Sequence, residues 1–341
     1  MDERIGARQG TFPAGILVEI ELSEGEAAIE VGWVGEVARH RGAKLAHGLA
    51  QVVPDLTVVV NTADDAELHG LWISPDVDTV LYTLAGRIDP VKGWGLAGDT
   101  DAVLGAMAEL GEDTWFHLGD KDLATHVVRT ARLRAGATLT QVTEQLRTAL
   151  RVSARVLPMS DDRVATTLRT AHGSLGFQEY FVRRQHRDDV LDVTFDGVEA
   201  AHPAPGVLEA LTAADVVLLG PSNPFVSIGP VLAVPGVREA LATSGARRLA
   251  VSPVVGGRVL KGPAAHMLAT LGHDVSALGV ARLYAGLVDV FVVDEQDAHL
   301  APAIRELGMA VHEARTVMGP DAADRARLAR DLLAIAAAPH P

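Results

Sequence analysis

The stretch LTVVVNTADD, residues 56–65, contains the pattern that decides the fold of this chain. Residues 57–61 are nearly continuously apolar and rich in valine and are predicted to form a strand, and small polar residues and carboxylates follow. A run of this kind is typical of a central parallel strand, because helices cover both faces of such a strand. Ligands bind beyond the carboxyl ends of parallel strands, so the polar residues that follow are candidates for a site.

The same pattern recurs at residues 215–219, 248–251 and 289–293. Helices are predicted between the strands, for example at 138–150, which has capping-box spacing, and at 263–271, which begins with proline and ends before glycine. We therefore predict an α/β fold with a doubly wound, mainly parallel, Rossmann-like sheet and an inserted α+β subdomain.

The predicted main domain binds a nucleotide and consists of two stretches, 42–151 and 199–341. The predicted insertion spans 152–198 and departs from the strand–helix rhythm. Its apolar runs look like antiparallel strands around one helix, at residues 155–157, 163–168 and 190–195 for the strands and 177–184 for the helix.

Residues 1–41 form an atypical N-terminal segment. Residues 17–21 and 28–31 alternate between apolar and acidic side chains, as a hairpin does and as a buried parallel strand does not. We expect residues 1 to about 40 to be the least tightly packed part of the main domain.

Composition excludes several classes of function. The chain has 341 residues, 48% of them hydrophobic, and a formal net charge of -14, which disfavours nucleic acid and anionic membranes as partners. Cysteine is absent, so disulfides, thiolate catalysis and cysteine-ligated zinc are excluded. No apolar run reaches the ~18 residues of a membrane span, and the first residues do not resemble a signal peptide. We predict a cytoplasmic protein.

Two carboxylate pairs follow the first predicted strand. Asp64 and Asp65 come directly after it, and Asp76 and Asp78 follow a Ser-Pro helix entry. Mg²⁺ prefers one or two carboxylates together with phosphate oxygens, so these residues are candidate ligands. Aspartates are also common helix caps and turn formers, and for either pair alone this second interpretation is favoured.

Two loops after later strands suit a nucleotide. One combines prolines with hydroxyl and amide groups, and the other has paired glycines beside the cations Arg258 and Lys261. The candidate residues in these loops are Gly220, Ser222, Asn223, Ser252, Gly256, Gly257 and Lys261. Either loop alone could be an ordinary connection, but two loops at matching positions favour binding.

Lysine occurs at only four positions, namely 44, 92, 121 and 261. Lys121 lies in the first turn of a predicted helix, where a cation opposes the helix dipole, and this indicates a ligand. The histidines show no metal-ligand spacing, and we expect His126, His172 and His186 to be solvated or to cap helices.

Seven segments in order give the chain a specific resemblance. Together they resemble the 2-phospho-L-lactate transferase family of coenzyme F420 biosynthesis, and its actinobacterial branch most of all. The segments are residues 57–65, 74–79, 93–95, 118–122, 177–181, 220–224 and 252–263.

The resemblance implies transfer of a phosphoenolpyruvyl or phospholactyl group from its guanosine diphosphate ester to the hydroxyl of the deazaflavin Fo, with release of GMP. It implies that Asp78 and Lys121 bind Fo and act in catalysis, with Asp78 orienting the hydroxyl. It also implies Mg²⁺ on Asp64 and Asp65, and leaves a homodimer open. Lys44, Asn61 and the two loops would hold the guanosine and its diphosphate.

One departure concerns the phosphate loop. The family begins with a strand and a Gly-Gly-x-Gly-Gly-Ala-Lys loop, whereas here only Gly42, Ala43 and Lys44 match its end. Divergence and a shifted reading frame would both produce this pattern. We expect the first strand of the sheet to be missing or replaced, which would weaken diphosphate binding near Lys44.

Two other classes compete with the transferase. A nucleotide-sugar-binding regulator, resembling the gluconeogenesis-factor proteins, would share the fold without the transfer. The segments around Asp78 and Lys121 argue against it. A nicotinamide dehydrogenase is disfavoured because no Gly-x-Gly-x-x-Gly follows a predicted strand.

Overall fold

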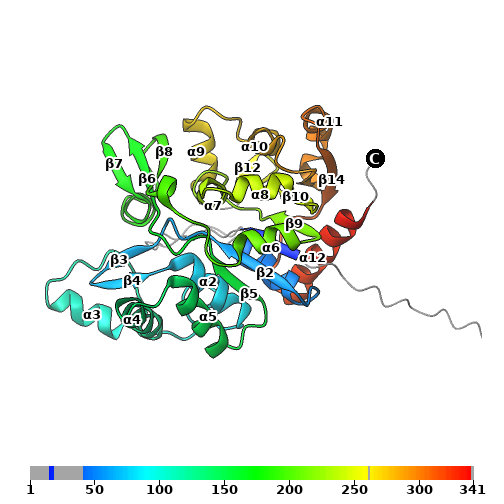
Figure 1. Cartoon of the computed structure of the whole chain (residues 1–341). Helices are drawn as coiled ribbons and strands as arrows, with labels where there is room; N and C mark the ends of the chain where they lie inside the picture. Colours follow the sequence, from blue (N-terminus) through cyan, green and yellow to red (C-terminus); the bar gives the residue numbers. More distant parts are fainter. Residues whose placement is uncertain (1–14, 19–40, 260–261, 339–341) are drawn as a thin grey trace, which may run out of the picture.

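A seven-stranded sheet, parallel throughout, lies at the centre of the computed structural model, which describes residues 15–18, 41–259 and 262–338 (Figure 1). In spatial order its strands are β14 (Ala310–Ala314), β13 (Val290–Asp294), β10 (Arg247–Val251), β9 (Val216–Leu219), β1 (Gly15–Val18), β2 (Leu56–Val60) and β5 (Arg155–Pro158). The predicted doubly wound α/β class is confirmed.

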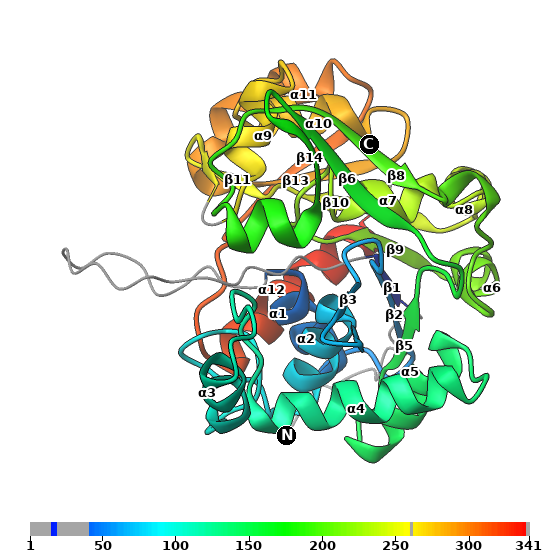
Figure 2. The same cartoon turned by 90° about the vertical axis from the view of Figure 1, so that its left-hand side faces the viewer.

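Helices cover both faces of the sheet, in two layers that Figure 2 shows above and below it. One layer contains α1 (Arg41–Ala50), α2 (Pro75–Leu84), α5 (Leu139–Ala149) and α12 (Ala322–Ala337). The other contains α6 (Val207–Ala213), α7 (Ile228–Ala233), α8 (Val237–Thr243), α10 (Ala277–Tyr284) and α11 (Ala301–Arg305). Val58 and Val60 point into the first core and Val59 into the second, which explains why three successive positions of the strand are apolar.

Strand β1 corrects an expectation. Gly15 lies opposite Leu56 of β2 on one side and Val216 of β9 on the other, so the chain does have a central first strand. The expectation of a missing strand was wrong. It depended on the alternating residues 17–21, which combine the last two residues of β1 with the acidic stretch that follows them in the sequence. The predicted hairpin at 28–31, and the predicted packing of the rest of 1–40, lie outside the described residues.

The predicted insertion contains a separate antiparallel sheet, beside the main sheet in Figure 1. Its strands are β6 (Ala165–Thr170), β7 (Gly173–Gly176) and β8 (Val190–Asp196), and a π-helix spans Glu179–Arg183. One strand was assigned wrongly: residues 155–157, expected to be antiparallel, belong to β5 and pair in parallel with β2. A three-residue apolar run does not reveal its direction, so only the partner strand settles it.

A third apolar cluster joins the insertion to the carboxyl edge of the main sheet. It includes Phe177 and Phe181, whose rings stack at 5.4 Å, together with Val226 after β9 and Ile73. The remaining elements of the described residues are β3 (Ala66–Leu68), β4 (Leu71–Ile73), α3 (Ala102–Glu109), α4 (Asp120–Arg134), β11 (Val254–Val255), β12 (Arg258–Val259), α9 (Ala264–Thr270) and two 3-10 helices, Val198–Ala200 and Glu295–Leu300.

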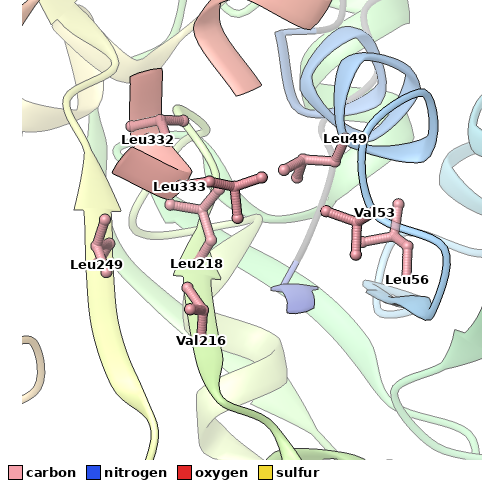
Figure 3. A pocket seen from close by; sticks show the side chains of 8 residues that line it. All are labelled: Leu49, Val53, Leu56, Val216, Leu218, Leu249, Leu332 and Leu333. Atoms are coloured by element: carbon pink, nitrogen blue, oxygen red, sulfur yellow. The ribbon is translucent and has the colours of Figure 1, made fainter. Parts of the chain in front are cut away.

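A small cavity lies between α1, α12 and the sheet (Figure 3). Its lining is Leu49, Val53, Leu56, Val216, Leu218, Leu249, Leu332 and Leu333. All eight side chains are hydrocarbon, so this cavity is a packing feature and offers a charged substrate no partner. None of the helices in the described ranges combines the length and the apolar character needed to cross a membrane.

Candidate active site at the carboxyl edge of the sheet

Asn61 organises the first part of the site. It follows β2 directly and is fully buried, and its Nδ2 donates to Asp64 Oδ2 and to Asp76 Oδ2, both at 3.0 Å. Its Oδ1 accepts from the Ala63 amide at 2.9 Å, which fixes the orientation of the side chain. One amide nitrogen therefore holds together two carboxylates that lie far apart in sequence.

The Asp64–Asp76 pair carries unbalanced charge. Both residues are buried, and burial, followed by the negative charge of Asp64, raises the pKa of Asp76 well above its usual value. Within the described part of the chain, Asp76 Oδ1 is buried and has no hydrogen-bond partner. A hard divalent cation would relieve the repulsion and use this oxygen, so the donor set fits Mg²⁺.

Asp65, the second predicted ligand, is engaged elsewhere. Its Oδ2 accepts from Ser74 Oγ at 2.6 Å and from Trp72 Nε1 at 3.0 Å, and burial raises the pKa of Asp65 to about 7. These bonds tie the loop to β4 and to the start of α2. The geometry therefore favours Asp76 over Asp65 as the partner of Asp64, and metal ligation stays a prediction.

Asp78 belongs to a second buried cluster, between α2 and α4. Arg129 Nη1 donates to Asp78 Oδ2 at 2.9 Å, and Nη2 donates to Oδ1. The arginine side chain is 0% exposed and the aspartate side chain 5%. Burial raises the pKa of the Asp78 carboxyl, and the adjacent guanidinium opposes that shift.

The rest of the cluster lies along the same face of α4. His126 Nδ1 is 3.6 Å from Asp78 Oδ2, and His126 Nε2 is 3.5 Å from Asp122 Oδ2. Tyr82 of α2 donates to Asp122 Oδ1 at 2.7 Å. Burial opposes ionisation of Asp122, but the hydrogen bond and charge of His126 outweigh it, so the pKa of Asp122 is lowered.

Asp78, Asp122 and His126 offer ligand atoms within 4.8 Å of one another and could hold a metal ion. Arg129 already supplies a cation to Asp78, however, so the Asp64–Asp76 pair is the better metal site. The expectation for His126 was wrong, since the ring is 1% exposed and neither solvated nor at a helix end.

Lys121 lies at the exposed beginning of α4. Its Nζ donates to the carbonyl oxygens of Gly98 at 2.6 Å and Ala97 at 3.2 Å. Asp99 caps the helix, accepting from the amides of Lys121 at 2.7 Å and Asp122 at 3.1 Å. A Cβ at Gly119 would lie 2.3 Å from Asp99 Oδ2, so this cap requires glycine there.

The loop after β9 is held by its own side chains. Asn223, fully buried, accepts from the Phe225 amide at 2.9 Å through Oδ1, and its Nδ2 lies 3.3 Å from Met267 Sδ. The Ser222 amide donates to Gly220 O at 2.8 Å. These contacts shape the loop, so a ligand would meet mainly its backbone.

The loop after β10 is built in a similar way. Ser252 Oγ donates to Val254 O at 2.8 Å and accepts from its amide at 3.1 Å. Gly256 and Gly257 have φ of +58° and +71°, and the Gly256 amide donates to Asp297 Oδ2 at 2.8 Å. The predicted cation Lys261 lies outside the described residues.

Two long-range contacts bring these segments together. Asn61 Nδ2 also lies 3.3 Å from Val226 O, which links the carboxylates to the loop after β9. Arg41, at the start of the helix that carries Lys44, donates to Pro253 O at 2.9 Å and to Thr316 O at 3.2 Å. The predicted residues after β2, β9 and β10 thus converge on one edge of the sheet.

Sequence reasoning missed Arg129, Asp122 and His126 as members of a site. The spacing of these residues on α4, four and then three apart, places them on one helix face, and this pattern was visible in the sequence. Sequence reasoning also did not single out Asp76 as a partner of Asp64.

Comparison with known proteins gives consistent findings. The profile of the family 2-phospho-L-lactate transferase CofD matches residues 40–334. A phosphoenolpyruvate transferase from Kitasatospora aureofaciens is 43% identical over 304 residues, covering 86% of this chain and 94% of that protein. A 2-phospho-L-lactate transferase from Methanosarcina acetivorans is 43% identical over 277 residues, covering 81% and 90%.

Among solved structures, a UPF0052 family protein from Bacillus halodurans is similar, with a TM-score of 0.56 and 18% identity. The match covers 95% of this chain and 100% of that chain. At this level of identity the likeness shows the fold alone.

Proposed function

Because the chain belongs to the 2-phospho-L-lactate transferase family, we propose that it makes a coenzyme F420 precursor by transferring a phosphoenolpyruvyl or phospholactyl group to the deazaflavin Fo. The donor is the guanosine diphosphate ester of that group, and the second product is GMP. The acceptor hydroxyl oxygen forms a bond to the phosphorus that carries the organic group. The bond from that phosphorus to the bridging oxygen of GMP breaks, and the hydroxyl proton is released.

The observation that carries the proposal is the pair of buried carboxylates on Asn61. Asp64 and Asp76 are held 3.0 Å from one amide nitrogen and are connected through that residue to the loop after β9. Mg²⁺ held there would supply positive charge to the phosphoryl oxygens, which gain charge during transfer.

Asp78 and Lys121 are the proposed acceptor residues. Arg129 keeps the carboxylate of Asp78 in one orientation, so that it can accept a hydrogen bond from the Fo hydroxyl. Lys121 is exposed at the beginning of α4, the helix that also carries Arg129. Its ammonium group can contact an acceptor at the edge of the site.

The donor is proposed to bind along the loops after β9 and β10, with Lys44, Asn61 and the predicted cation Lys261. Both loops offer backbone groups, and Gly256 and Gly257 allow close approach of a diphosphate because neither has a side chain.

The similarity does not separate the two donors, because both kinds of relative are 43% identical to this chain. A phosphoenolpyruvate transferase from Streptomyces coelicolor shares that identity over 86% of the chain, so both esters are tested as donors.

Mass spectrometry tests the proposal. The protein is incubated with Fo, Mg²⁺ and each guanosine diphosphate ester in turn, and both the F420 precursor and GMP are measured. Equal amounts of precursor and GMP are expected, with loss of both when the metal is chelated. GMP without a modified deazaflavin would indicate hydrolysis and contradict the transfer.

A further inference from the structure

The ion pair between Asp78 and Arg129 is buried and doubly hydrogen-bonded. Arg129 is 0% exposed and directs both Nη atoms to one carboxylate. Buried ion pairs stabilise proteins weakly, because desolvation offsets the attraction, so stability alone is a poor explanation for this pair.

We infer that Arg129 is a positioning residue that holds the Asp78 carboxylate in the orientation needed to accept the hydroxyl of the acceptor. The inference rests on the proposed function, because it assigns a role through Asp78. Arg129 itself does not reach the substrate, since only Asp78 keeps a small exposed fraction, 5% of its side chain.

The contact with Arg129 leaves the Asp78 carboxylate able to accept a further hydrogen bond. Each carboxylate oxygen has two lone pairs, and the arginine uses one on each oxygen. His126 Nδ1, at 3.6 Å from Oδ2, is too far away for a good hydrogen bond. A lone pair on each oxygen therefore stays available, while the plane of the carboxylate is fixed by the guanidinium.

Other contacts keep the arginine itself in place. His126 Nδ1 lies 3.2 Å from Arg129 Nη1. The Tyr82–Asp122 hydrogen bond, 2.7 Å long, joins α2 to α4 on the other side of the cluster. Arg129 lies on α4 and Asp78 on α2, so the arginine approaches the carboxylate from a different element, and the Tyr82–Asp122 bond holds these two elements together.

The test compares Arg129→Gln, Arg129→Lys and the control Arg132→Gln, which lies on α4 outside the buried cluster. Steady-state kinetics are measured for Fo and for the donor ester. Misplacement of a reacting group by about 1 Å can reduce turnover ~10²-fold, so we expect a loss of that order in kcat for Arg129→Gln. The KM of the donor should stay within about twofold, and Arg129→Lys should recover part of kcat because it keeps the charge without the paired geometry.

The same change is then made in an Asp78→Asn background. If Arg129 acts through Asp78, Arg129→Gln lowers kcat in the wild type and does not lower it further in Asp78→Asn. An equal loss in both backgrounds, or an unchanged kcat in folded Arg129→Gln, overturns the inference. If Arg129→Gln does not fold, Arg129→Lys decides: wild-type kcat in that variant overturns the inference and a selective loss supports it. Absence of product from the wild-type protein would instead overturn the proposed function, and this assignment with it.

Discussion

The proposed acceptor side and the proposed donor side of the site are built on different principles. Around Asp78 the groups are buried titratable side chains, paired across α2 and α4 by Arg129 and within α4 by His126 and Asp122. In the loops after β9 and β10 the polar side chains of Asn223 and Ser252 turn inward to bond their own loops, so the backbone is what a ligand would meet.

The two sides are therefore sensitive to different kinds of substitution. A cluster of buried charges depends on every partner, because removing one member leaves another charge unpaired in a poorly solvated place. A backbone site depends on loop conformation and tolerates changes of charge, but it is sensitive to any residue that cannot adopt the required φ.

The largest expected effect comes from Asp78→Asn, which breaks the charged side. Loss of an orienting carboxylate should reduce turnover ~10²–10⁴-fold. Because Arg129 then stays buried without its partner charge, the free energy of unfolding should fall by about 3–5 kcal/mol. Turnover and chemical denaturation measure the two effects.

The double variant Asp78→Asn with Arg129→Gln serves as its control. It should recover much of the stability, since no charge is left unpaired, and none of the activity. A single Asp78→Asn variant as stable as the wild type would show that the ion pair contributes nothing to folding.

A second test concerns the proposed metal site at Asp64 and Asp76. Asp76→Asn should make the metal-free protein more stable, because it removes one of two repelling buried carboxylates. It should also abolish stabilisation by Mg²⁺, which in the wild type would reach about 2.7 kcal/mol at a concentration one hundred times Kd. Melting temperatures in EDTA and in Mg²⁺ give both quantities.

The matched control is Asp65→Asn, since Asp65 is bonded to Ser74 and Trp72. Retained stabilisation by Mg²⁺ in Asp65→Asn identifies Asp76 as the partner of Asp64. Loss of stabilisation by Mg²⁺ in Asp65→Asn, with stabilisation retained in Asp76→Asn, would instead support Asp64 and Asp65 as the ligand pair, as expected from the sequence.

A smaller effect is expected from Gly256→Ala on the donor side. At φ of +58° alanine costs roughly 1–2 kcal/mol, and its Cβ would lie 3.0 Å from Gln296 Oε1. Affinity for GDP should fall about tenfold by calorimetry, while binding of Fo, followed by its fluorescence, should not change. Gly245→Ala is the control, because a Cβ there meets nothing within 4 Å. Equal losses for both ligands would show that the two sides are not separate.

The remaining test is a pH dependence of stability in metal-free buffer. The pKa of Asp65 is about 7 in the folded protein, above its value of 3.8 when unfolded, so the folded state binds the proton more tightly. Stability should therefore fall as pH rises from about 4 to 7, by at most about 1.4 kcal/mol per pH unit. Asp65→Asn should flatten the profile in that range. An unchanged profile would place its origin in another carboxyl group, such as that of Asp76.

Much of the fold could be predicted because buried parallel strands are apolar at each position. Residues 57–61 were expected as a strand, and β2 spans Leu56–Val60. The first strand was missed because four residues are too few to separate from the acidic residues that follow. The direction of β5 was missed because direction depends on the partner strand.

In the candidate site, too, local sequence patterns revealed some residues, and others depend on contacts between elements far apart in the sequence. Asp64, Asp78 and the glycine loops could be found from local patterns after strands. Arg129 could not be assigned to Asp78, because their contact depends on how α4 lies against α2. Asn223 could be located but not interpreted, because whether an amide faces a ligand or its own loop depends on the side-chain rotamer.

The position of β1 has a consequence for synthesis on the ribosome. This strand alone joins the β2–β5 half of the sheet to the β9–β14 half, and its partner β9 lies far along the chain, at Val216–Leu219. At ~5–20 residues per second, the roughly 200 residues between them take on the order of 10–40 s to translate. During that time one edge of β1 is without its native neighbour, and exposed strand edges can pair with other chains. The yield of native protein should therefore depend on translation speed and on chaperones more than its thermodynamic stability would suggest.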